Sequence, residues 1–168
     1  YQLRRSIIKK QMALMSYNSI LFLAKLGDVD RALEFARHHR GRQFELIREI
    51  ARIAAPVDPD KAVDILSQLA YSADNRNIFN QCTYRLAAAE EILRITPTFR
   101  DTTLRFIDEA TNLEHEIPEP HLTTYKIEWK LPVLTLSGDL DTALQLTGGL
   151  TELQQARALR CISLTLAL

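Results

Sequence analysis

Two arginines four residues apart, Arg48 and Arg52, are the clearest candidates for chemistry in this 168-residue chain. On a helix, residues at this spacing share one face, so both guanidinium groups can reach the carboxylates of a single partner. Glu45 lies three residues before the pair, and the basic stretch just upstream contributes Arg40 and Arg42. The arginines among these five residues predict a surface that binds an anionic partner, not a reactive centre.

The same residues also have a purely structural interpretation. Glu45 with Arg48, and Glu49 with Arg52, have the spacing of helical ion pairs, each worth about 0.2–0.5 kcal/mol. The basic stretch RHHRGRQ at 37–43 can simply end a helix, with its cations near the negative end of the helix dipole and a glycine as the stop. Both interpretations remain open from the sequence.

A second polar stretch, NLEHEIPEPH at 112–121, gathers His115, His121 and several carboxylates. Pro118 and Pro120 make this segment a stiff turn, and it has no helical pair of ligands four residues apart, so we expect no metal site. The sequence contains no glycine-rich phosphate loop, no Gly-x-Ser-x-Gly elbow and no Cys/His nucleophile pattern. We therefore expect no cofactor and no enzymatic activity.

Composition predicts an all-α protein that positions these side chains. The chain is 46% hydrophobic and 25% charged, with only five glycines and six prolines, which is typical of a folded helical domain. Cys82 and Cys161 have no paired spacing and are expected to be buried free thiols, which agrees with a reducing, cytoplasmic location. The most apolar stretch, 12–26, contains several polar residues, so no membrane span is expected.

Three aromatic residues, Phe106, Tyr125 and Trp129, have two interpretations. Large aromatic side chains in helical patterns are more often core residues than partner-binding residues. We therefore expect all three in the core.

The charge is balanced overall but unevenly distributed. Residues 1–56 carry a net charge of +6, whereas residues 57–168 carry −6. The acidic remainder argues against nucleic acid, because a strand that follows several repeats needs basic charge along most of its path. The split also suggests self-association, in which the basic half of one copy docks on the acidic half of another.

Four similar helix starts indicate an internal repeat. They read DRAL at 30–33, DKAV at 60–63, DTTL at 101–104 and DTAL at 141–144. Acidic residues favour helix starts, and the small residue in each start allows a neighbouring helix to approach closely. With the patterns between them, these starts predict about nine helices, arranged as antiparallel hairpins at about 3–40, 43–72, 77–116 and 121–150, with a last helix at 152–168.

The turns within this pattern resemble those of tetratricopeptide repeats. The family's Leu-Gly-Asp linker, followed by an apolar residue and Ala-Leu, is matched by Leu26, Gly27, Asp28, Val29, Ala32 and Leu33, and again by Gly138, Asp139, Leu140, Ala143 and Leu144. The resemblance implies that the hairpins stack as an α-solenoid, a TPR-like superhelix, in one domain over 1–168 that we expect to be a segment of a longer protein. It also implies that the first helix of each hairpin lines a concave groove, with Glu45, Arg48 and Arg52 in or beside it.

The resemblance leads to one functional hypothesis and two alternatives. We expect a non-catalytic scaffold that binds a partner protein or peptide, acidic in character, through the groove of a helical repeat. One alternative is an RNA-binding helical repeat. The other is a sensor or regulatory domain of a larger enzyme or regulator. Fold analogy carries much of this inference.

Overall fold

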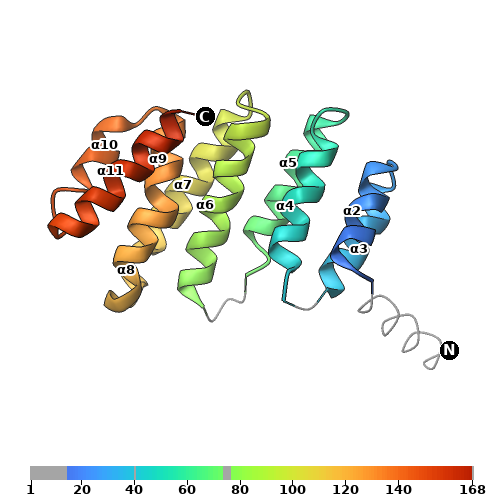
Figure 1. The fold of residues 1–168 in the computed structure, drawn as a ribbon, viewed down its shortest axis with the longest axis horizontal. Helices are drawn as coiled ribbons and strands as arrows, with labels where there is room; N and C mark the ends of the chain where they lie inside the picture. The colour runs from blue at the N-terminus through green and yellow to red at the C-terminus, as the bar shows by residue number, and fades with distance from the viewer. Residues whose placement is uncertain (1–14, 40, 74–76, 168) are drawn as a thin grey trace. The chain divides into compact units, whose positions relative to one another are not determined.

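The computed structural model describes residues 15–39, 41–73 and 77–167 (Figure 1). Within these ranges the chain is helical and has no β-strand, which confirms the all-α prediction. The chain divides into two compact units, Tyr1–Ser67 and Gln68–Leu168, and each is described by itself. The single repeat domain and its solenoid arrangement stay predictions.

The first unit is built from neighbouring antiparallel helices. α2 (Tyr17–Lys25) packs against both α3 (Val29–His38) and α4 (Gln43–Ala54), and α5 (Pro59–Ala70) starts in this unit and continues past its boundary. Ser16 caps α2, because its hydroxyl accepts a hydrogen bond from the backbone N–H of Ser19 at 3.2 Å. The buried side chains that α2, α3 and α4 bring together are Ile20, Ala24, Ala32, Leu33, Ala36, Leu46, Ile47, Ile50, Ala51 and Ala54.

The second unit begins with a long helical pair and ends with another long helix. Its elements are α6 (Ile78–Ile95), α7 (Arg100–Leu113), the 3-10 turn η1 (Glu114–Glu116), α8 (Glu119–Tyr125), the π-helical segment η2 (Lys126–Lys130), α9 (Leu131–Ser137), α10 (Leu140–Gln145) and α11 (Glu152–Leu166). α6 pairs closely with α7 and also contacts α9, and α11 packs on α9.

The two Gly-Asp turns have the same backbone geometry although they lie in different units. Gly27 and Gly138 adopt φ angles of +90° and +87°, in the left-handed region that favours glycine. The backbone N–H of Asp28 donates to the carbonyl of Leu23 at 3.1 Å, and the N–H of Asp139 donates to the equivalent carbonyl five residues back at 2.9 Å. This pattern is the Schellman motif, which ends one helix and redirects the chain.

The small residue in each of the four similar helix starts is fully buried. These residues are Ala32, Ala62, Thr103 and Ala143. The aspartates within those starts lie in the first helical turn, and at two of the starts a capping carboxylate comes two residues earlier. Asp58 Oδ1 accepts from the N–H of Lys61 at 2.9 Å, and Asp139 Oδ1 accepts from the N–H of Thr142 at 3.2 Å. Asp28 makes no capping bond with its side chain, and the N-cap of α7 is Phe99.

Pro132 neither ends nor interrupts the helical run from Glu119 to Ser137. A proline inside a helix removes one N–H donor, and its ring crowds the carbonyl four residues back. Here the five residues before Leu131 widen into a π-helix, in which the N–H of Leu131 donates to the carbonyl of Lys126. The wider turn accommodates the proline without a break.

Most of the residues that were predicted to be buried are buried in the structure. Phe106 and Tyr125 are fully buried as predicted, whereas Trp129 is only partly buried. Both cysteines are free thiols, and Cys82 is buried, but the prediction that Cys161 is buried is wrong, since its side chain is half-buried on α11. Among the described residues, no helix is both long enough and apolar enough to cross a membrane.

Candidate functional site

The structure places most of the predicted anion-binding residues on one helix. Glu45, Arg48 and Arg52 lie on α4, and Arg42 occupies its N-cap position. Arg40 lies outside the described residues. The sequence spacing therefore identified a single structural element that carries the predicted site.

The amphipathic pattern of α4 explains why its charged side faces outward. Five apolar residues of the helix are buried, whereas Glu45 and Arg52 are exposed and Arg48 is half-buried. This burial fixes the rotation of α4, because the apolar stripe must pack against α2 and α3. The buried residues are Leu46, Ile47, Ile50, Ala51 and Ala54.

Two of the arginines stack on aromatic rings. The guanidinium carbon of Arg42 lies 4.3 Å from the ring centroid of Tyr17 on α2, and that of Arg48 lies 5.6 Å from the centroid of Phe44. Such cation–π contacts restrict the orientation of a guanidinium group. The Arg42–Tyr17 contact also joins the starts of α4 and α2.

Arg52 forms the internal ion pair that the structural interpretation predicted. Its Nη1 donates to Glu49 Oε1 at 2.6 Å, and both side chains are more than a third exposed. Exposed pairs of this kind contribute about 0–1 kcal/mol, so a partner's carboxylate can compete with Glu49 for Arg52.

An exposed aromatic side chain occupies the corresponding position of α2. The buried Ala32 and Ala62, which hold the same place in the similar stretches DRAL and DKAV, are 30 residues apart. At this offset Arg52 corresponds to Phe22, whose side chain is 60% exposed. The outward sides of α2 and α4 therefore offer an aromatic ring and a set of guanidinium groups.

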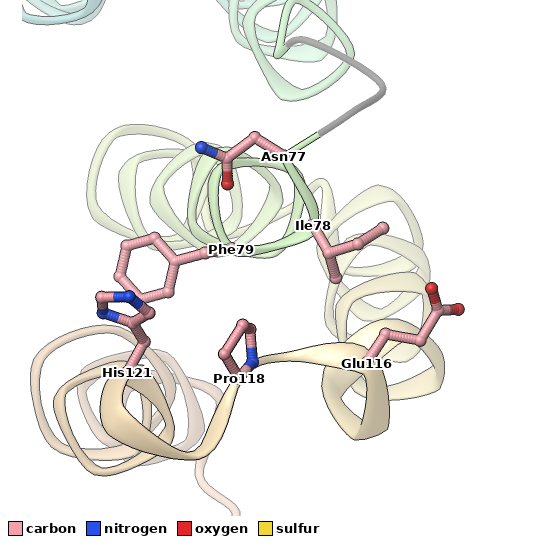
Figure 2. A pocket seen from close by; sticks show the side chains of 6 residues that line it. All are labelled: Asn77, Ile78, Phe79, Glu116, Pro118 and His121. Atoms are coloured by element: carbon pink, nitrogen blue, oxygen red, sulfur yellow. The ribbon is translucent and has the colours of Figure 1, made fainter.

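A second candidate site is an open hollow of about 490 Å³ in the second unit (Figure 2). The ring of Phe79 and the imidazole of His121 lie against each other, with centroids 5.5 Å apart and planes tilted by 54°. Sequence reasoning missed this hollow, because the two residues are 42 positions apart and only tertiary packing brings them together. The described residues that line it are Asn77, Ile78, Phe79, Glu116, Pro118 and His121.

The polar stretch at 112–121 does not form a metal centre in the part of the chain that the structure describes. There, no group of three or more His, Cys, Asp or Glu side chains is placed to hold a metal ion. His115 Nε2 lies 4.0 Å from Glu116 Oε1, whereas His121 contacts the ring of Phe79. The two histidines therefore have different neighbours and do not share a site.

No protein-family model, curated protein or solved structure shows significant similarity to the chain. Over the residues that the structure describes, the protein is of the all-α class, and the chain divides into two compact units. Two features of these units are candidate binding sites, the arginine-bearing side of α4 and the open hollow beside Phe79.

Proposed function

We propose that this chain is a non-catalytic interaction module whose first unit binds an acidic segment of a partner protein along α4. One observation carries the proposal: Arg42 at the N-cap of α4 stacks on Tyr17 of α2, and Arg48 within α4 stacks on Phe44. Stacking restricts these long side chains before the partner arrives, so less conformational entropy is lost when they bind.

The charge distribution supports an acidic partner. Residues 1–56 carry a net charge of +6, which attracts an anionic segment and repels a basic one. Charge complementarity of this kind increases the rate of association and suppresses wrong partners.

The turn geometry supports the resemblance to tetratricopeptide repeats. The turns at Gly27 and Gly138 share the same φ region and the same six-residue hydrogen bond, and the following Ala32 and Ala143 are both fully buried. Repeats of that family bind extended peptides on the first helices of their hairpins, the position that α2 and α4 take under the resemblance.

A pull-down from cell lysate, with and without nuclease treatment, tests the proposal. The bait is the native chain, the double variant Arg48→Glu/Arg52→Glu, or the control variant Arg31→Glu/Arg37→Glu, which makes the same charge change on α3 of the same unit. Circular dichroism first confirms that all three are folded. We expect specific proteins on the native bait that an acidic peptide displaces and that the α4 variant loses, while the α3 control keeps them.

The results also decide between the rivals. Equal capture by all three baits would reject α4 as the site, and equal loss in both variants would show that bulk charge alone is responsible. Capture that nuclease treatment abolishes would replace the proposal with RNA binding, because arginines and aromatic rings can also contact single-stranded RNA.

A further inference from the structure

The hollow in the second unit has an apolar lining with one carboxylate at its edge. Figure 2 shows Phe79 and His121 on one side, Ile78 and Glu116 on the other, and Pro118 between them. Phe79 and Ile78 are partly exposed, so their apolar surface is accessible from solvent. A ligand that fits here needs an apolar stem and a group that a carboxylate attracts.

The polar side chains of the lining are those of Asn77, Glu116 and His121, and the imidazole of His121 lies against the ring of Phe79. Asn77 is used as the cap of α6, since its Oδ1 accepts a hydrogen bond from the N–H of Asn80 at 3.0 Å. Glu116 Oε1 lies 4.0 Å from His115 Nε2, and the two side chains are 48% and 76% exposed. An exposed pair of this kind is weak, so a ligand's cation can replace His115 as the partner of Glu116. Among the described lining residues there is no lysine or arginine.

We propose that this hollow is a second binding site, which accepts an arginine side chain of a partner protein. Its aliphatic stem lies against Ile78, Phe79 and Pro118, and its guanidinium pairs with Glu116. Arginine fits better than lysine, because a guanidinium is weakly hydrated, stacks on aromatic rings and pairs with a carboxylate through two N–H groups.

The surrounding charge favours the same occupant. Glu119 lies in the first turn of α8, beside Pro118, and residues 57–168 carry a net charge of −6. An acidic side chain would be repelled by these carboxylates. A purely apolar side chain would fill the hollow but would make no favourable interaction with the charge of Glu116. This site is independent of the arginine-bearing side of α4 and has the opposite charge preference.

Nuclear magnetic resonance titration of the full chain tests the assignment. One probe is N-acetyl-arginine amide, and the matched probe is N-acetyl-citrulline amide, which has nearly the same shape and no charge. We expect saturable shifts of the backbone amides of Ile78, Phe79 and His121 with the arginine probe, and binding of the citrulline probe about twofold to fivefold weaker.

Three variants separate the contributions of the lining. Glu116→Gln should remove the difference between the probes, whereas Asp108→Asn, which makes the same charge change at an exposed position of α7, should keep it. Phe79→Leu should weaken the arginine probe by about twofold to fivefold, because part of the apolar surface that contacts the stem is lost.

Equal binding of the two probes, no saturable shift at these amides, or an unchanged preference in Glu116→Gln would each overturn the assignment. Sedimentation of the native chain identifies one further outcome. If the native chain is a dimer and Glu116→Gln is a monomer, a second copy of the chain occupies the hollow. That result would overturn the claim that the occupant comes from a separate partner protein.

Discussion

Cys82 is the residue with the clearest link between burial and pH. Burial raises the pKa of its thiol to about 11, and nearby Glu114 adds to the shift while Arg85 opposes it. An unfolded chain exposes the thiol, whose pKa then returns to about 9. The native state therefore keeps a proton that the unfolded state releases between these two pKa values.

This difference predicts a loss of stability at alkaline pH. Stability from Cys82 is complete below pH about 9 and is lost as the pH rises toward 11, with a loss of about 1 kcal/mol between pH 8 and pH 10. Urea unfolding at both pH values measures it, and Cys82→Ala should show a smaller loss. The same loss in Cys82→Ala would contradict the assignment to this thiol.

Lys130 and Glu114 form an ion pair inside the second unit. Lys130 is 7% exposed, and its Nζ donates to Glu114 Oε2. Removing one partner leaves a charge without compensation, so Lys130→Met should lower the free energy of unfolding by about 3 kcal/mol. The double variant Lys130→Met/Glu114→Leu should recover most of that loss in urea unfolding. A double variant as unstable as the single one would show that packing, not charge, is responsible.

At the scale of elements, the Gly-Asp turns make a direct prediction. An added Cβ at Gly27 or Gly138 meets no atom within 4 Å, so the cost of alanine there comes from the positive φ angle alone. Gly27→Ala or Gly138→Ala should each destabilise the chain by about 1 kcal/mol.

Gly149→Ala is the matched control for these two variants. Its added Cβ also meets no atom within 4 Å, but Gly149 does not have a positive φ angle. Thermal unfolding should therefore show no loss for this variant. Equal melting temperatures for all three variants would contradict the role of the left-handed turn.

Helix α4 and the segment around Pro132 show what the sequence could predict about elements. The apolar stripe of α4 repeats with the helical period, so the sequence located the helix and the exposed side that carries Arg52. The general rule for proline in a helix predicts a kink or an end at Pro132, but the structure has a π-helical turn just before it, supported by packing against α6 and α11. A rule that considers proline only within its own helix does not take these contacts with neighbouring helices into account.

The two candidate sites differ for the same reason. Arg48 and Arg52 belong to one helix, and helical spacing alone places them on one side. Phe79 and His121 belong to α6 and α8, and nothing in the local pattern of either segment indicates that their rings meet. The sequence drew attention to His121 for its carboxylate neighbours and predicted no metal site there, but it did not predict the aromatic contact with Phe79.

At the scale of the whole molecule, the charge split predicts salt-sensitive self-association. Residues 1–56 and 57–168 carry equal and opposite net charges, so two copies attract each other when their unlike halves meet. Sedimentation equilibrium should show association in about 0.02 M salt that weakens in about 0.5 M salt, where screening shortens the range of the attraction. A strictly monomeric protein at low ionic strength would contradict this prediction.

The central claim is that the chain recognises an acidic segment through the arginines of α4. Fluorescence anisotropy with a labelled octaglutamate peptide and a labelled single-stranded RNA octamer tests it most directly. We predict that the native chain binds the peptide more tightly than the RNA, and that Arg48→Glu/Arg52→Glu weakens peptide binding by about tenfold. The α3 control, Arg31→Glu/Arg37→Glu, should weaken it much less. Equal losses in the two variants, or tighter binding of the RNA, would contradict the claim.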